Sequence, residues 1–411
     1  MRISRPPADA QVRLDDIDLA DVGLYTDGDA HLVWQTLRAR CPVFWQAQPS
    51  GEGFWAVTRH PDVRRVLAEY ETFTSERGTA IAMLDAHDPS AGLMMQATDP
   101  PRHRQYRQQI GRHFSAFAVT GLTERVRSFV RAALEPAMDG QPWDVAESFA
   151  RLPMAVAAVM MGLPEKDVDP LLKLAYAALA PRDPRYRSGP EKATSTFAHY
   201  DIIRYFSEQV ASRRERPASD LIGHLLSVEI DGGLLTEEAI VLNCLSLLLG
   251  AVVTTSHAIN ATIIALAEPG GGEGHWPDAM PVRAAVEEAL RWSSPVTHFM
   301  RRARRDVEMH GTMIRAGDAV TAWIASANRD EDVFERPYAL DFQRSPNRHV
   351  TFGFGSHRCI GSSLARLMLQ HSFELLVSEI ECFEIAGTPY HLVSNEIAGV
   401  VSLPLSVKLR R

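Results

Sequence analysis

The stretch Thr351-Phe-Gly-Phe-Gly-Ser-His-Arg-Cys-Ile-Gly361 places a single cysteine, Cys359, at the end of a glycine-rich loop. Gly353 and Gly355 flank one phenylalanine, a spacing that suits backbone angles which residues with a Cβ avoid. The residues after Gly361 are typical of an amphipathic helix. A Cys359 thiolate would therefore lie at a helix N-terminus, where free N–H groups and the helix dipole favour negative charge. The stretch predicts a cysteine held as an anion, as a metal ligand or nucleophile, rather than an inert buried thiol.

The fixed positions of this stretch resemble the haem-ligand loop of the cytochrome P450 family. They are Phe352, Gly353, Gly355, His357, Cys359 and Gly361. The resemblance implies that Cys359 is the proximal ligand of the iron of haem b (iron protoporphyrin IX), and that Phe352, His357 and Gly361 lie at the cofactor. A thiolate in that role pushes electron density onto iron and favours O–O cleavage.

Composition excludes several other classes of protein. The chain has 411 residues, 45% of them hydrophobic, and a net charge of −8, with no basic tail that would indicate nucleic acid as a partner. Its four cysteines lie far apart without a CxxC pair, which favours a reducing cytoplasm. We expect no signal peptide and no membrane anchor, because the uninterrupted apolar run at 247–253 is far shorter than the about 20 residues of a membrane span.

The segment Asp99-Pro-Pro-Arg-His-Arg-Gln-Tyr-Arg107 places His103 and Arg107 four residues apart on one face of a helix. Two basic residues at that spacing are most often solvated, yet two donors one turn apart also suit a carboxylate. The segment resembles the part of the family in which a histidine and an arginine bind a haem propionate, and this role is expected for His103 and Arg107. By the same resemblance, residues 73–95 cover the substrate.

A long apolar helix is predicted to begin at Thr236-Glu-Glu and to contain Gly250-Ala-Val-Val-Thr-Thr255. In the family, small residues such as Gly250 and Ala251 let this helix approach haem, and a threonine at the position of Thr254 serves oxygen activation, often followed by a second such as Thr255. The family's acid is replaced by Val253, so protons must come from water, the substrate or His257. A minor relay role for His257 competes with the interpretation that its ring points into the protein.

Further motifs match the family in order. Glu288, Arg291 and Arg344 correspond to a structural charge cluster, and Arg301 corresponds to another propionate ligand with Arg302 as its rival. The resemblance places a set of residues in the substrate pocket, namely Val253, Val296, Thr297, Phe299 and Val400. A basic docking face on the cysteine side is expected from Arg102, Arg104, Arg348, Arg358 and Arg366, although single arginines are equally often just solvated.

The fold implied is mainly α with a small β-rich lobe, one domain over residues 1–411, with haem between the Gly250–Thr255 helix and the Cys359 loop. The reaction implied is activation of dioxygen and insertion of one oxygen atom into a C–H bond. Electrons would pass from NAD(P)H through a reductase and a ferredoxin or flavodoxin, because no flavin or iron–sulfur module is present in the sequence. A cytoplasmic monomer is expected.

The substrate and several alternatives stay open. The motif around Val253 is loosely similar to bacterial family members that hydroxylate aminoacyl groups on carrier proteins, and a free small molecule of secondary metabolism is an equal alternative. Val253 also suggests a peroxide-using enzyme or an oxidative coupling enzyme. A haem protein that senses or carries a gas without catalysis is a further alternative, as is a zinc or structural protein.

Overall fold

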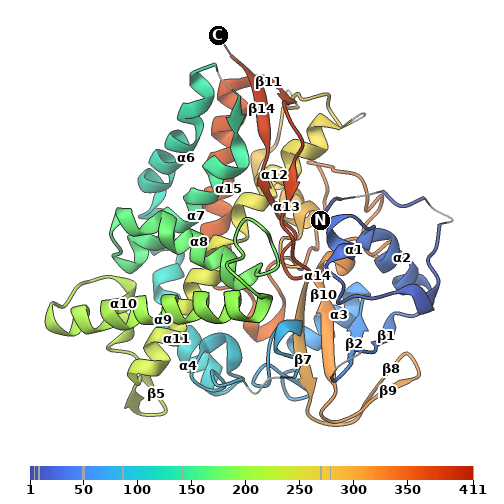
Figure 1. The fold of residues 1–411 in the computed structure, drawn as a ribbon, viewed down its shortest axis with the longest axis vertical. Helices are drawn as coiled ribbons and strands as arrows, with labels where there is room; N and C mark the ends of the chain where they lie inside the picture. Colours follow the sequence, from blue (N-terminus) through green and yellow to red (C-terminus); the bar gives the residue numbers. More distant parts are fainter. Residues whose placement is uncertain are drawn as a thin grey trace.

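The computed structural model describes residues 1–3, 5–7, 10–48, 51–85, 88–140, 142–268, 271–277 and 279–410. Figure 1 shows most helices gathered on one side of the molecule and a sheet formed by β1, β2, β10 and β7 on the other. The expected fold class, mainly α with a small β-rich lobe, is confirmed.

The described helices and strands have the following bounds. The helices are α1 (Gly23–Thr26), α2 (Ala30–Arg40), α3 (His60–Ala68), α4 (Arg102–Ile110), α5 (Ala116–Thr120), α6 (Thr123–Met138), α7 (Val145–Met161), α8 (Val168–Leu179), α9 (Glu191–Glu215), α10 (Leu221–Leu225), α11 (Glu237–Val252), α12 (Thr255–Ala267), α13 (Val282–Ser293), α14 (Ile324–Ala327) and α15 (Ser362–Glu379). The strands are β1 (Val43–Gln46), β2 (Phe54–Val57), β3 (Phe73–Thr74), β4 (Trp143–Asp144), β5 (Glu229–Ile230), β6 (Gly233–Leu234), β7 (His298–Ala303), β8 (Val307–Met309), β9 (Thr312–Ile314), β10 (Ala319–Trp323), β11 (Ile380–Ile385), β12 (Tyr390–His391), β13 (Val400–Ser402) and β14 (Pro404–Leu409).

Side-chain caps fix where the central helices begin. The Thr236 side chain accepts a hydrogen bond from the Ala239 N–H at 3.2 Å, so α11 starts where the sequence predicted. Asp144 accepts hydrogen bonds from the N–H groups of Ala146 and Glu147 and starts α7 in the same way. These caps satisfy N–H groups that the first helical turn leaves without partners.

The long apolar helix is interrupted at the position expected to carry chemistry. α11 ends at Val252, and α12 begins at Thr255, with non-helical backbone angles at Val253 and Thr254. Four consecutive β-branched residues crowd this turn. The Thr254 hydroxyl also donates a 3.4 Å hydrogen bond to the Gly250 carbonyl, an interaction that bends helices. The prediction of one continuous helix is therefore corrected to two helical segments.

Among the described residues, one helical stretch, 237–267, is long and apolar enough to cross a membrane. Of its most apolar window, 61% is buried inside the protein. Both ends are tied to neighbouring segments: the Asn243 amide bonds to the backbone of Met95 and Leu93, and the Asn260 amide donates to the Val400 carbonyl at 3.0 Å. This burial is the environment of a core helix.

The larger sheet has the strand order β1-β2-β10-β7-β3. β10 pairs antiparallel with β7, and Val320 lies opposite Arg301 in the register. Adjacent residues of a strand point to opposite faces, so Arg301 and Arg302 face different sides of this sheet. A second sheet, β11-β14-β4, joins the C-terminus to the start of α7.

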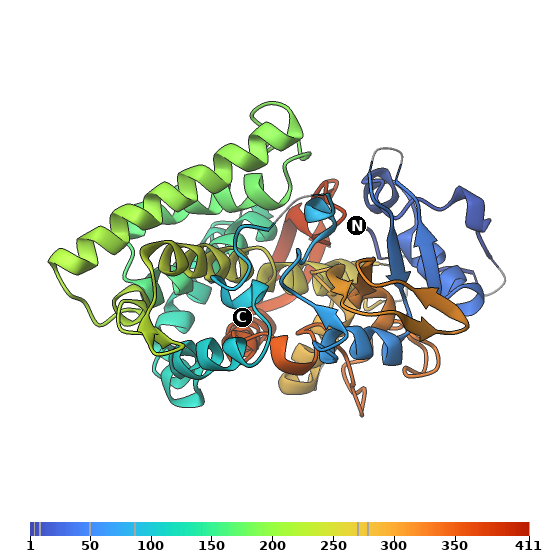
Figure 2. The same cartoon turned by 90° about the horizontal axis from the view of Figure 1, so that it is seen from below.

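Apolar clusters hold the central helices in place. One cluster joins residues of α7, α8, α9 and α11, and another joins residues of α6, α7, α12, α13 and α15. Figure 2 shows α11 and α12 (olive to yellow) running through the middle of the molecule, beside the long α9 (light green). The helices α11, α12 and α15 are thus held in place by packing against their neighbouring helices, with α7 in both clusters.

Candidate active site

The Cys359 loop is a tight turn in front of α15. Gly353 and Gly355 have φ angles of 70° and 75°, in the left-handed region that favours glycine. A Cβ on Gly355 would lie 2.7 Å from the Cα of Ala68, so the loop also packs closely on α3. The Cys359 N–H donates to the Phe352 carbonyl at 2.7 Å, which closes the turn and directs the chain into α15.

The Cys359 side chain lies among backbone donors and cations. It retains accessible surface, although it lies deep enough for burial to raise the pKa of its thiol. The Gly361 N–H and then Arg107, Arg366 and Arg358 act in the opposite direction and lower this pKa. A thiol with such donors and cations around it is prepared to bind a metal cation, which displaces the thiol proton.

One face of the α11 C-terminus is lined by small residues. Gly250 is exposed, and no atom lies within 4 Å of the position that a Cβ would take there. Ala251 and Thr254 are half-buried, whereas Thr255 is 5% exposed. Ile360, next to Cys359, packs against the apolar cluster that contains Val252. The structure thus leaves open space beside Gly250, as a flat ligand requires.

Four basic side chains converge near the Cys359 loop: His103, Arg107, Arg301 and His357. The rings of His103 and His357 lie 4.2 Å apart between centroids. Burial, followed by the charges of His357, Arg107 and Arg301, lowers the pKa of His103 to about 3. Burial lowers the pKa of Arg301 to about 10. Burial and the neighbouring cations therefore disfavour further positive charge in this cluster.

Few hydrogen-bond acceptors of the protein lie within reach of this basic cluster. Among the described residues, the His103 Nδ1 has no hydrogen-bond partner, the Arg107 guanidinium makes no hydrogen bond or ion pair, and Arg301 donates only to the adjacent Met300 carbonyl at 2.7 Å. Buried donors without acceptors are costly unless a ligand supplies them. Two carboxylates carried by a flat ligand would satisfy these donors, so the residues present fit haem and its propionates.

The structure separates Arg301 from its rival Arg302. Arg302 donates to a Glu52 carboxylate oxygen at 2.5 Å and to the Gly317 carbonyl at 3.1 Å. Arg301 is 4% exposed and lies on the opposite face of β7. Of the two arginines, Arg301 is therefore the one directed to the basic cluster.

Asp99 is a site residue to which sequence reasoning gave no role. Its carboxylate accepts hydrogen bonds from the Thr74 hydroxyl at 2.5 Å, the Ser75 N–H at 3.1 Å and Arg304 at 2.6 Å. The His357 Nε2 lies 3.7 Å from an Asp99 oxygen. These donors keep the pKa of Asp99 well below its usual range despite burial. The Asp-Pro-Pro sequence before His103 is the feature of the sequence that could have indicated a role for Asp99.

Glu288, Arg291 and Arg344 form one buried cluster. Glu288 and Arg291 are both 0% exposed and share two hydrogen bonds of 2.7 and 2.8 Å. Arg344 Nε lies 3.1 Å from the same carboxylate. Arg291 also donates to the carbonyls of Asn328, Pro337 and Ala339, which ties α13 to the segment before the cysteine loop.

The expected substrate-pocket residues divide into two groups. Val296 and Phe299 are half-buried and retain accessible surface. Thr297, Val253 and Val400 are instead 0%, 1% and 5% exposed. The Thr297 hydroxyl donates to the carbonyls of Asn395 at 2.6 Å and Glu396 at 3.1 Å, so it holds the turn that contains these two residues. The assignment of all five residues to the substrate pocket stays a prediction, and Val296 and Phe299 are the two that present surface in this structure.

His257 lies within the protein core. It is 1% exposed, and burial lowers the pKa of its imidazole to about 4, so the ring is neutral. A Cβ on Gly399 would come within 2.5 Å of the His257 Nε2, and the ring of Tyr176 lies 6.4 Å away. This placement favours a packing role over a proton relay.

The expected docking arginines also divide. Arg102 pairs with Asp231 at 3.3 Å, and Arg366 pairs with Glu287 at 2.6 Å while covering the Phe352 ring at 4.5 Å. The side chains of Arg104, Arg348 and Arg358 are exposed and have no partner among the described residues. Of these five arginines, Arg104, Arg348 and Arg358 therefore present an unpaired positive charge to a redox partner.

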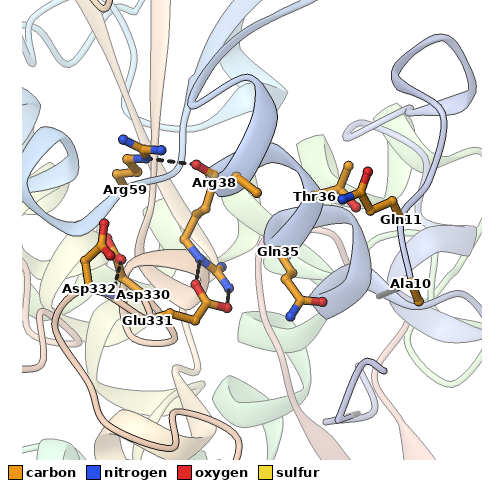
Figure 3. A pocket seen from close by; sticks show the side chains of 10 residues that line it. Ala10, Gln11, Gln35, Thr36, Arg38, Arg59, Asp330, Glu331 and Asp332 are labelled. Atoms are coloured by element: carbon orange, nitrogen blue, oxygen red, sulfur yellow. Dashed lines mark hydrogen bonds and ion pairs between the residues drawn. The ribbon is translucent and has the colours of Figure 1, made fainter. Parts of the chain in front are cut away.

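A surface cleft of about 300 Å³ lies elsewhere, between the N-terminal segment, α2 and residues 330–332 (Figure 3). Arg38 crosses it and pairs with Glu331 at 2.8 Å, while its guanidinium also donates to Tyr338. Cys359 does not line this cleft. The cleft is therefore separate from the candidate site.

Comparison with known sequences gives consistent relatives. The family model described as Cytochrome P450 matches residues 278–410. The chain is 34% identical to Cytochrome P450 NovI of Streptomyces niveus, over 98% of this chain and 100% of the relative. It is 31% identical to Linalool 8-monooxygenase of Pseudomonas putida, over 94% of this chain and 97% of the relative.

Solved structures agree with the sequence comparison. P450 OxyD, described as involved in the biosynthesis of vancomycin-type antibiotics, superposes with a TM-score of 0.83 at 33% identity, over 96% of this chain and 100% of that chain. P450BioI in complex with a fatty-acid-ligated acyl carrier protein superposes with a TM-score of 0.79 at 25% identity, over 91% of this chain and 97% of that chain.

Proposed function

This chain belongs to the cytochrome P450 family of haem-dependent monooxygenases, and from that premise we propose that it oxidises an aminoacyl group held on a carrier protein in bacterial secondary metabolism. Haem b with a cysteinate ligand supplies reductive activation of dioxygen and insertion of one oxygen atom into the substrate, the other leaving as water. The observation that carries the site assignment is the basic cluster beside the Cys359 loop, in which the His103 Nδ1 and the Arg107 guanidinium have no hydrogen-bond partner among the described residues.

Each residue of the site has a proposed role. Cys359 ligates iron, and the cations and N–H groups around it stabilise the thiolate. His103, Arg107, Arg301 and His357 would bind the propionates. Phe352, Gly361, Gly250 and Ala251 shape the two walls of the cofactor site.

Thr254 and Thr255 are the proposed catalytic hydroxyls. Thr254 Oγ1 is half-accessible and is held by the Gly250 carbonyl, so it lies at the face where dioxygen would be bound. To relay a proton there, its single O–H would turn away from the Gly250 carbonyl. Val253 cannot ionise and is buried, so solvent protons must reach Thr254 without the acid that the family places before it.

Electrons reach the enzyme from NAD(P)H through a reductase and a ferredoxin or flavodoxin. The exposed, unpaired Arg104, Arg348 and Arg358 would attract the acidic surface of such a carrier and raise its association rate. We further propose that residues 1–411 act as one cytoplasmic domain and as a monomer.

One neighbour supports the setting in secondary metabolism, and another supports the choice of a carrier-bound substrate. OxyD is described as part of antibiotic biosynthesis, and P450BioI is described in complex with an acyl carrier protein. The relative named Linalool 8-monooxygenase favours a second candidate, a free apolar alcohol of the terpenoid class. A peroxide-using reaction is the alternative suggested by Val253.

Reconstituted turnover separates these candidates. The haem-loaded enzyme is supplied with ferredoxin, reductase, NADPH and dioxygen, and is offered an aminoacyl carrier protein, the free amino acid or linalool. Mass spectrometry is expected to show the gain of one oxygen atom on the aminoacyl carrier alone. Oxidation of linalool but not of the carrier-bound group contradicts the proposed substrate, and turnover with hydrogen peroxide but not with NADPH contradicts the proposed electron route.

A further inference from the structure

The turn before β13 is fixed between the two elements that carry Thr254 and Arg301. The Thr297 N–H donates to the Glu396 carbonyl at 2.9 Å, and the Ala398 N–H donates to the Pro295 carbonyl at 2.7 Å, immediately before β7. On the other side, Gly399 packs against His257, three residues after Thr254. The backbone of Glu396 is therefore tied to the segment that leads into β7, the strand that carries Arg301.

The Glu396 carboxylate has no partner in the described part of the chain, since no hydrogen bond or ion pair reaches it. Burial alone raises the pKa of this carboxyl to about 7, and no charged group lies near enough to contribute. The residue nevertheless retains accessible surface. Like Cys359, it therefore combines accessible surface with an environment that disfavours charge.

Asp183, another buried acid, shows how this protein treats a carboxylate that only supports structure. It is 0% exposed, and its oxygens accept hydrogen bonds from the N–H groups of Arg185 at 2.8 Å and Val393 at 2.9 Å. An acid that is buried without such donors is costly. Groups of this kind concentrate at ligand-binding and catalytic sites.

We propose that the Glu396 carboxylate binds an ammonium group of the substrate and so selects substrates that carry a protonated amine. This proposal rests on the proposed function, because a carrier-bound aminoacyl group presents such an ammonium. An ammonium supplies three donors and a positive charge to a carboxylate that has neither. A neutral analogue of the same shape leaves the carboxyl unsatisfied, and sites built around a buried polar group discriminate strongly against such analogues.

The test compares two ligands that differ only in the amino group. They are the N-acetylcysteamine thioesters of L-phenylalanine and of 3-phenylpropanoic acid, titrated into haem-loaded protein by calorimetry. Wild-type enzyme is expected to bind the ammonium ligand more tightly by roughly tenfold or more. Glu396→Gln and Glu396→Met are expected to abolish this preference while they bind the neutral ligand as wild type does. Glu384→Gln, which removes an exposed acid of β11, is the control and keeps the preference.

Several outcomes overturn the proposal. One is equal binding of the two ligands by wild-type enzyme. Another is tighter binding of the ammonium ligand that persists in either Glu396 variant. The third is that neither ligand binds to either variant. The last outcome would show that Glu396 supports the fold and does not recognise the amine. The calorimetric preference needs no iron–thiolate bond, so a spectrum without a cysteinate ligand would refute the proposed function independently of this result.

Discussion

Replacing Glu288 by alanine is expected to destabilise the protein far more than the same change at its neighbour Glu287. Glu288 accepts hydrogen bonds from Arg291, Arg344, Asn347 and the Asp341 N–H, and it is 0% exposed. Its removal leaves two buried guanidinium groups without their counter-charge, a loss of about 3–5 kcal/mol.

Glu287 supplies a matched comparison one position earlier in α13. It pairs with Arg366, and both side chains are 31% exposed, so solvent screens the interaction. Burial opposes ionisation there, but Arg366 and His349 hold the pKa of Glu287 at about 2. Because the pair is partly solvated, its loss is expected to cost about 1 kcal/mol or less.

Urea unfolding of the haem-loaded proteins, followed by far-ultraviolet circular dichroism, measures both effects. The Glu288→Ala midpoint is expected to fall by several times the shift seen for Glu287→Ala, with an unchanged slope. Glu288→Gln keeps the shape and some of the hydrogen bonds and is expected to lie between wild type and Glu288→Ala. Equal shifts for the two alanine variants would refute the reasoning that the buried cluster holds the segment before Cys359.

The remaining predictions concern the cofactor, the reaction and the redox partner. Arg301→Leu is expected to lose haem at least roughly tenfold faster than wild type in a transfer assay to apomyoglobin, because a buried charged donor to a carboxylate disappears; Arg302→Leu, which faces the other side of β7, is expected to retain haem. Thr254→Ala is expected to lower the amount of product formed per NADPH consumed by roughly tenfold or more. Thr254→Ser, which keeps a hydroxyl, is expected to form as much product per NADPH as wild type. An equal yield of product per NADPH in the two variants would exclude the role of the hydroxyl in proton delivery. Arg358→Ala is expected to raise the KM for ferredoxin and to weaken its salt dependence, whereas Arg131→Ala on α6 changes neither.

The parts of the fold that were predictable from sequence rest on local patterns. The glycines around Phe354 require positive φ angles, and both have them in the structure. The cap at Thr236 is a local hydrogen bond, so the start of α11 could be predicted from the sequence around Thr236. The family motifs extended this reasoning to the fold class, which the structural relatives confirm.

Long-range contacts explain what the sequence did not show. The break after Val252 depends on crowding and on the Thr254 hydroxyl within a helix that otherwise has a continuous apolar pattern. The hydrogen bond from the Thr297 hydroxyl to the Asn395 carbonyl joins residues 98 positions apart, and no local pattern indicates it. The missing partner of Glu396 is a property of its surroundings in space, and no residue pattern reports such an absence.

The carbon monoxide difference spectrum of the reduced, haem-loaded protein tests the central claim most directly, since it reports the ligand opposite the gas. Wild-type protein is expected to show the strongly red-shifted Soret band of a cysteinate ligand. Cys359→Ala is expected to lose this band, while Cys244→Ala, which removes a buried thiol of α11, keeps it. A haem spectrum of wild-type protein without the shift would contradict the assignment of Cys359 and the monooxygenase chemistry together.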